Sequence, residues 1–247
     1  MLVSCFTFGQ DSLKSVPSNE FKQVFVGVNI SPDYCYRTLT NTDDNPFNSF
    51  ITDFRNNNEK AKYSYTAGLN IYYKISKCTG FEAGVQYSNK GYQSKTDDLT
   101  FGDLIDPRYG FVYATTQGPV PTTARFIENY NYLDIPLRAI FSLGKKKLSF
   151  VASIGITANI LLKATETVIL EYENAASKRE RNAQSYNFKK INLSPTISLG
   201  ADYKISKRLN LRAEPTFRYG ILTIIDAPIS EYLWNGGINI SCYYKLK

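Results

Sequence analysis

Seven charged residues lie in segments where apolar and polar residues alternate, and their chemistry needs an explanation. They are Glu82, Asp134, Arg138, Asp202, Arg212, Glu214 and Arg218. Carboxylates such as Glu82 and Asp134 can act as general acids and bases, and charged side chains also line ion filters and proton paths. Charged groups that cannot reach water are, however, usually paired with each other. We therefore interpret the seven residues as structural ion pairs.

The motifs of common enzyme classes are absent. The chain contains no histidine, which excludes Ser-His-Asp triads and histidine-ligated metal sites. Neither G-x-G-x-x-G nor G-x-x-x-x-G-K-[ST] occurs, so no phosphate-binding loop is indicated. The wide spacing of Cys5, Cys35, Cys78 and Cys242 indicates neither a disulfide framework nor a metal site. We expect no enzyme activity, no cofactor and no metal.

One hairpin shows most clearly which elements hold the charged residues. From Leu133 to Leu143 the odd positions are apolar, whereas the even positions include Asp134 and Arg138. A period of two residues predicts a β-strand with one apolar face. After a polar turn the alternation continues over residues 148–162. Arms of about 15 residues exceed the 5 to 6 usual in globular proteins and suit tilted strands that cross a bilayer.

The same alternation predicts eight strands. They span about residues 23–38, 62–75, 81–95, 129–143, 148–162, 187–204, 209–225 and 234–246. Long and short connections alternate between them, as in outer-membrane barrels. The predicted fold is all-β, an eight-stranded antiparallel up-and-down transmembrane β-barrel with periplasmic termini and extracellular long loops. Bulges are expected at Pro136, Pro195 and Pro215, because proline cannot donate to the hydrogen-bond ladder.

The polar face distinguishes a membrane barrel from a soluble one. Alternation alone also fits a secreted lipocalin-type barrel, which is apolar inside and binds a small apolar ligand. A face in contact with water would carry many Lys and Glu, but here Gly, Ser, Thr and Asn predominate beside the seven charges. Small polar groups and paired charges suit the interior of an eight-stranded barrel, which side chains just fill. We therefore expect the apolar face to contact lipid and the interior to pass no solute.

The N-terminus indicates export. Residues 1–9, M-L-V-S-C-F-T-F-G, are similar to the end of a secretory signal peptide. We expect a residual signal peptide over 1–9, an N-terminal periplasmic segment over 10–22 and an outer-membrane β-barrel over 23–247. Leu2-Val3-Ser4-Cys5 also fits a lipoprotein box, so lipidation at Cys5 is an alternative.

Three predicted loops, at residues 41–60, 96–127 and 171–185, are longer than a hairpin needs. Loops of more than about 12 to 15 residues are usually functional or disordered. The second loop carries the apolar residues Phe101, Leu104, Ile105, Tyr109, Phe111 and Tyr113. These side chains either cover the barrel mouth as a lid or bind a neighbouring membrane protein.

The formal net charge of +7 does not indicate nucleic-acid binding, because the Lys and Arg residues are scattered over turns and loops. We expect outer-membrane lipid and other outer-membrane proteins as partners, and no small-molecule substrate.

Four segments carry a resemblance to a known family. They are Tyr132-Leu-Asp-Ile-Pro-Leu-Arg138, Gly68-Leu69-Asn70, Glu82-Ala-Gly-Val-Gln-Tyr-Ser-Asn-Lys-Gly91 and Leu211-Arg-Ala-Glu-Pro-Thr-Phe-Arg-Tyr219. Over about residues 25–247 the chain resembles the PorT-like outer-membrane β-barrel family of Bacteroidetes. The resemblance implies a small barrel, and family members range from type IX secretion components to barrels of unassigned role. The predicted function is a structural or accessory subunit of an outer-membrane complex for secretion, uptake or assembly, with a type IX secretion component as the narrower alternative.

Overall fold

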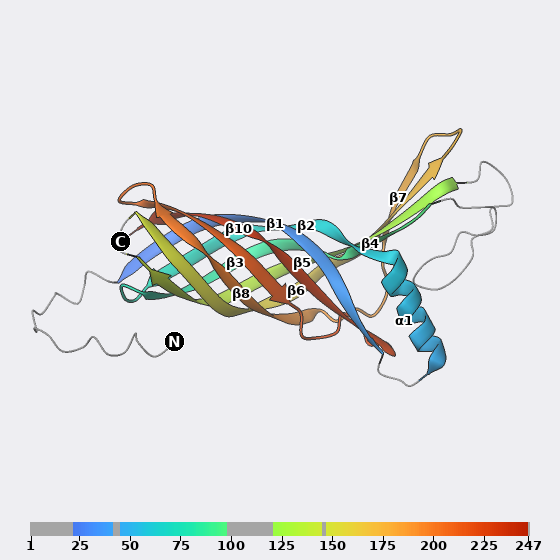
Figure 1. Ribbon diagram of the computed structural model, residues 1–247, viewed down its shortest axis with the longest axis horizontal. Helices are drawn as coiled ribbons and strands as arrows, with labels where there is room; N and C mark the ends of the chain where they lie inside the picture. The colour runs from blue at the N-terminus through green and yellow to red at the C-terminus, as the bar shows by residue number, and fades with distance from the viewer. Residues whose placement is uncertain (1–21, 42–44, 98–120, 145–146, 247) are drawn as a thin grey trace, which may run out of the picture.

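A closed ring of antiparallel strands encloses a polar interior in the computed structural model, which describes residues 22–41, 45–97, 121–144 and 147–246 (Figure 1). The wall consists of β1 (Gln23–Asn41), β2 (Glu59–Lys74), β3 (Thr79–Lys90) with β4 (Tyr92–Thr96), β5 (Pro121–Leu143), β6 (Leu148–Tyr172), β8 (Ile191–Lys204), β9 (Leu209–Tyr219) and β10 (Ile229–Lys245). β1 pairs with both β2 and β10, which closes the ring. β3 and β4 both lie between β2 and β5, so they form one wall strand and the ring has the eight strands that the sequence predicts.

The two faces of the wall have the predicted orientation. Outward-facing Leu69 and Leu137 are 60% and 57% exposed, whereas all seven predicted interior charges are buried. Burial alternates residue by residue along β1, β8 and β9, because successive side chains of a strand point to opposite faces. The barrel is therefore apolar outside and polar inside.

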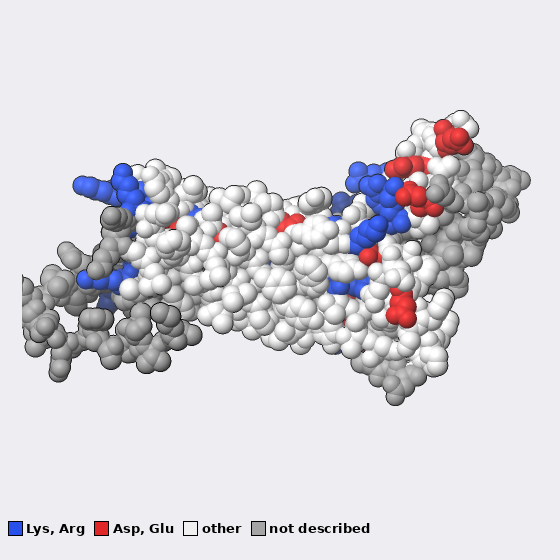
Figure 2. Space-filling model, viewed as in Figure 1, with Lys and Arg blue, Asp and Glu red and all other residues white. Residues whose placement is uncertain are grey.

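Aromatic residues form two bands around the outer wall, separated by aliphatic side chains. One band contains Tyr73, Phe81, Phe141, Phe150, Tyr203 and Tyr244, and the other contains Tyr34, Tyr63, Tyr65, Tyr87 and Phe217. On β1 the partners of Tyr73 and Tyr63 are Val24 and Tyr34, ten residues apart, which at the usual rise and tilt places the bands about 25 Å apart. On the face shown in Figure 2, few charged atoms lie along the middle of the barrel. This height matches the apolar zone of a membrane barrel.

The connections differ at the two ends of the barrel. At the end that contains Gln23 and Lys245, called here the termini end, the connections from β2 to β3, from β5 to β6 and from β8 to β9 are short, because each pair of strands is separated by only a few residues. The opposite end, called here the helix end, contains the longer connections and α1 (Pro46–Asn58) (Figure 1). The predicted alternation of connection lengths is therefore confirmed. No helix in the described residues has the length and apolar character to cross a membrane.

Several predicted loops at the helix end contain regular structure, so those predictions are wrong in detail. Residues 41–60 contain α1, and residues 171–185 contain β7 (Lys178–Ala183), which pairs with β6. β5 starts at Pro121 and β6 ends at Tyr172, which makes both strands longer than predicted, while β9 ends at Tyr219. The extended β5, β6 and β7 project beyond the ring (Figure 1). These segments have polar residues on both faces, so they lack the alternation that reveals a wall strand.

The prolines within strands interrupt hydrogen bonding without changing the register. The ladder between β3 and β5 lapses beside Pro136, and the ladder between β8 and β9 lapses beside Pro215, but each resumes in the same register. Pro195 pairs in register with β6. The bulges predicted at these three residues are therefore wrong, and a shift lies between Asn131 and Tyr132 instead. A missing N–H removes one bond, which the neighbouring pairs on the same strands can tolerate.

Glycines make room for the long interior side chains. A Cβ atom added to Gly155 would lie 2.9 Å from Cγ of Arg138, and one added to Gly200 would lie 2.7 Å from Cα of Glu214. Both distances are shorter than van der Waals contact, so the adjacent strands could not keep their spacing. Small and large residues alternate across the interior, which is how a narrow barrel is filled.

Candidate functional site

Glu82 is the centre of an ion-pair cluster in the interior near the termini end. Arg138, its direct cross-strand neighbour on β5, binds Oε1. Nη1 of Arg212 on β9 lies 3.1 Å from Oε2, and the hydroxyl of Tyr243 donates to the same oxygen at 2.5 Å. Each of these four side chains is at most 4% exposed. The carboxylate of Glu82 on β3 thus joins its own strand to β5, β9 and β10.

Arg212 extends the cluster to β8 and is held between two aromatic rings. Its Nη2 lies 3.1 Å from Oδ2 of Asp202. The guanidinium carbon lies 4.7 Å from the ring centroids of both Tyr72 and Tyr243. This distance is within the range of cation–π attraction, which strengthens where water is excluded. The two rings therefore hold the guanidinium group in position and offset part of the free-energy cost of burying its charge.

Glu214 completes this cluster. Its Oε2 lies 3.5 Å from Nη1 of Arg138, and its Oε1 accepts a hydrogen bond from Oγ of Ser198 at 2.9 Å. Five of the seven predicted residues, Glu82, Arg138, Asp202, Arg212 and Glu214, therefore form one connected network. Three carboxylates face two guanidinium groups there, and Tyr243 and Ser198 supply additional donors.

The other two predicted residues, Arg218 and Asp134, lie in the next layer of the interior. Nη1 of Arg218 lies 3.6 Å from Oδ1 of Asp33, and Oδ2 of Asp134 lies 3.4 Å from Nζ of Lys90. Asn159 also donates to Asp134 at 2.6 Å. The sequence prediction missed Asp33 and Lys90 as interior partners. Both residues lie at the alternate positions that are polar along their strands, and this pattern could have identified them as interior residues.

Little space remains between these layers. A cavity of about 10 Å³ lies midway along the interior, lined in part by Lys90, Tyr132 and Asn159. That volume is roughly what one water molecule needs. In the described part of the chain the larger cavities of the interior open at its two ends. The packing supports a plug of side chains rather than a channel.

A second ion-pair cluster lies at the helix end, and its members Arg55, Glu59 and Glu231 come from segments that the sequence analysis assigned to loops. Nε of Arg55, on α1, lies 2.6 Å from Oε1 of Glu59, and its Nη2 lies 3.0 Å from Oε2 of Glu231. Nε of Arg37 lies 2.7 Å from Oε2 of Glu59. The hydroxyl of Tyr92 accepts a hydrogen bond from Arg55 at 3.0 Å. This helix-end cluster ties α1 to β1, β2, β4 and β10.

The start of α1 has a recognisable local signal. The side chain of Asn45 accepts a hydrogen bond from the backbone N–H of Phe47 at 3.0 Å, and Pro46 occupies the first turn. Asparagine at the N-cap followed by proline is a favoured start of a helix. Burial lowers the pKa of Arg55, but Tyr92, Glu231 and Glu59 outweigh it and hold the pKa well above its usual value. Arg55 therefore stays charged and keeps α1 docked.

A pocket of about 250 Å³ lies between α1 and the barrel mouth. Its lining is mostly apolar and aromatic: Asn48, Ile51, Arg55, Tyr92, Tyr130, Gln184, Tyr186, Phe188, Ile224, Ile225, Ala227, Pro228, Ile229 and Glu231. The polar groups of Arg55 and Glu231 are already engaged with each other. The pocket thus offers apolar contact with few free polar groups.

Other predicted site features lie elsewhere. Residues Phe101, Leu104, Ile105, Tyr109, Phe111 and Tyr113 lie outside the described residues, so the lid and interface alternatives for them remain predictions. Within the described ranges, no group of three or more His, Cys, Asp or Glu side chains is arranged to hold a metal ion.

Comparison with known proteins gives one family match. Residues 15–226 match the family described as "Outer membrane protein beta-barrel domain". Similar solved structures include Neisserial surface protein A, with 8% identity, a TM-score of 0.46, and coverage of 90% of this chain and 97% of that chain. Ail of Yersinia pestis has 8% identity, a TM-score of 0.43, and coverage of 92% and 99%. OprG of Pseudomonas aeruginosa has 10% identity, a TM-score of 0.39, and coverage of 92% and 96%. No curated protein matches the chain.

The family match covers most of the chain and agrees with the closed ring, the polar interior and the aromatic bands of the outer wall. The chain therefore belongs to the outer membrane protein β-barrel domain family and is an integral outer-membrane β-barrel.

Proposed function

We propose that this barrel is a non-enzymatic and non-conducting accessory subunit of a larger outer-membrane complex, which it joins through its helix end. The observation that carries the proposal is the exposed apolar face of α1. Phe47 and Phe50 are 65% and 66% exposed. With Phe54 they lie at the spacing of one helix face. Because side chains fill the interior, we propose no transport role, and the surface of the barrel is then the part available for function.

The two faces of α1 have separate roles in this proposal. Asn48, Ile51 and Arg55 face the helix-end pocket. Phe47, Phe50 and Phe54 each precede one of these residues, so the phenylalanine face lies about 100° around the helix from the pocket face. Large apolar side chains that stay exposed on a helix held in place by ion pairs are typical anchors of protein interfaces. The ion pairs of Arg55 hold the helix in place before binding, so little ordering entropy opposes the association.

The lengths of the connections indicate how the barrel is oriented in the membrane. Short turns face the periplasm and long connections face outside in outer-membrane barrels, so the termini end is periplasmic and the helix end extracellular. An even number of strands puts both termini on the same side. The export signal predicted at residues 1–9 and the segment predicted at 10–22 are then placed on the periplasmic side, with lipidation at Cys5 as the alternative.

Two alternative functions make different demands on the barrel. A type IX secretion component of PorT type in Bacteroidetes is the narrower form of the same proposal, and it rests on the sequence resemblance. A secreted lipocalin-type barrel would bind an apolar ligand in an apolar interior. Here the interior carries charges such as Glu82 and Arg212, both at most 2% exposed, so it does not suit that ligand.

Co-purification from detergent-solubilised outer membrane tests the proposal. The wild type is expected to elute from a sizing column with partner proteins. Phe47→Ser combined with Phe50→Ser should leave the barrel folded but release it as a monomer. Asp53→Asn changes an exposed residue of the same helix that does not belong to the phenylalanine face, and it should leave the complex intact. Elution of the wild type as a monomer, or unchanged elution of the phenylalanine variant, would reject the proposal.

A further inference from the structure

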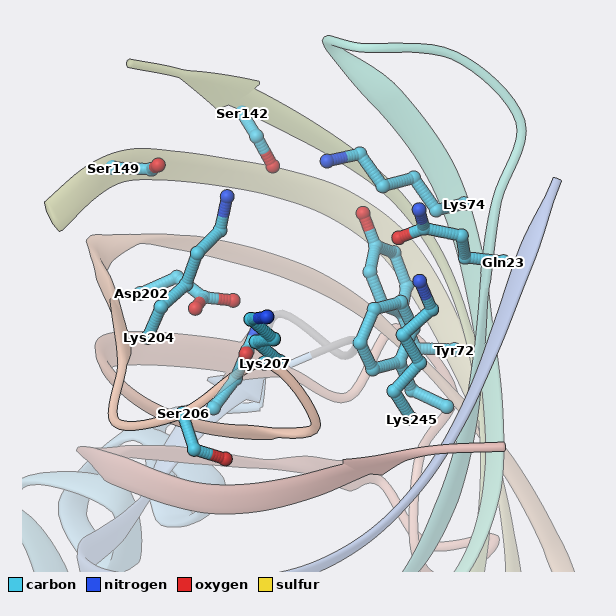
Figure 3. A pocket seen from close by; sticks show the side chains of 12 residues that line it. Gln23, Tyr72, Lys74, Ser142, Ser149, Asp202, Lys204, Ser206, Lys207 and Lys245 are labelled. Atoms are coloured by element: carbon cyan, nitrogen blue, oxygen red, sulfur yellow. The ribbon is translucent and has the colours of Figure 1, made fainter. Parts of the chain in front are cut away.

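The termini end of the barrel contains a basic pocket that the proposed function does not use (Figure 3). Its volume is about 280 Å³. Four lysine ammonium groups and three serine hydroxyl groups are among the groups that line it, from Lys74, Lys204, Lys207, Lys245, Ser142, Ser149 and Ser206. This combination of groups is suited to binding an anion.

The lysines converge on the barrel axis because they come from strand ends around the ring. Lys74 and Lys204 are the last residues of β2 and β8, Lys245 is the last residue of β10, and Lys207 lies in the turn between β8 and β9. Figure 3 shows their side chains around one opening. The pocket therefore opens at the mouth of the barrel and not on its lipid-facing wall.

The positive charge of this pocket is not balanced by nearby acids. None of the four lysines forms an ion pair with an acidic side chain in the described part of the chain. Asp202 also lines the pocket, but its Oδ2 lies 3.1 Å from Nη2 of Arg212. Interior lysine Lys90, by contrast, is paired with Asp134. Like charges gathered at one mouth repel each other and concentrate anions there.

We propose that this pocket binds a small anionic ligand that carries a phosphate group. Lysine ammonium groups bind phosphate as point charges, and serine hydroxyls can donate directional hydrogen bonds. A phosphate monoester supplies nearly two negative charges on one group at neutral pH, which offsets more of the local repulsion than a single carboxylate. The phosphate group belongs to a soluble compound or to a lipid headgroup, and the position of the opening on the axis favours the soluble compound.

Calorimetric titration of the intact barrel in phosphatidylcholine nanodiscs with inorganic pyrophosphate tests the proposal. The wild type should bind, and affinity should fall as salt is raised. Changing Lys74, Lys204, Lys207 and Lys245 to Gln should weaken binding about a hundredfold or more, because several charge-assisted contacts are lost. Changing the same four residues to Arg should preserve binding.

A matched control removes the same charge at the opposite end. Lys60, Lys163, Lys178 and Lys190 are exposed, and changing all four to Gln should leave pyrophosphate affinity unchanged. Absence of wild-type binding, or equal weakening in both Gln variants, would overturn the proposal. Nanodiscs that contain phosphatidylglycerol distinguish the sources: unchanged affinity supports a soluble ligand, and competition supports the same phosphate site filled by a headgroup.

Discussion

Replacing Leu137 by arginine places a charge on the lipid-facing wall at a depth that the structure defines. Leu137 is 57% exposed and lies four residues from Phe141 of the aromatic band near the termini end. At the usual rise and tilt it is about 10 Å inside that band, close to the middle of an apolar zone of about 25 Å. Its side chain therefore has no nearby water.

The expected loss in the free energy of unfolding is about 2 to 4 kcal/mol, the range for arginine near the midplane of a membrane barrel. Leu143→Arg is the matched control. Leu143 lies on the same strand and is 61% exposed, but it lies beyond Phe141 toward the termini end, where the cost falls to about 0 to 1 kcal/mol. Because the two leucines have similar exposure, the difference in stability between the two variants reports the depth of each residue in the membrane.

Reversible unfolding in urea from phospholipid vesicles measures both values, with the folded fraction read from the migration of unheated samples on gels. The m-value should be the same for both variants, so that a shift in midpoint reports stability alone. Equal stability of Leu137→Arg and Leu143→Arg would refute the assigned depth. Wild-type stability of Leu137→Arg would refute the assignment of this face to lipid.

Three further predictions concern the interior. Glu82→Gln should lower the free energy of unfolding by about 3 to 5 kcal/mol, because Arg138 and Arg212 would lose their shared carboxylate inside the barrel, and the same urea unfolding measures it. Gly155→Ala should cost about 1 to 3 kcal/mol by overpacking, whereas Gly236→Ala, whose added Cβ would lie 3.7 Å from its nearest neighbour, should keep wild-type stability; similar values for both would contradict the packing. Planar bilayers that contain the barrel should show no stable single-channel steps. A steady conductance that changes in the Arg212→Ala variant would show that the interior is a pore and not a plug.

Alternation in the sequence was enough to predict most of the wall, because the side-chain period of a strand is a local property. It assigned Leu137 outward and Asp134 inward, and both assignments agree with the structure. It failed at the helix end. There α1 and β7 lack a two-residue pattern. The Asn45-Pro46 start of α1 is a separate signal, which a search for alternation alone does not use.

The partners of the interior charges were decided by the tertiary structure. Glu82 and Tyr243 are 161 residues apart in sequence, and Asn29 and Asn239 are 210 apart. Such pairs meet only because the ring closes between β1 and β10, which fixes the register of every wall strand. The sequence alone determined which face each residue occupies, since that depends on parity. Register and closure determined which charges neutralise one another, and among the described residues they left the lysines of the basic pocket without an ion-pair partner.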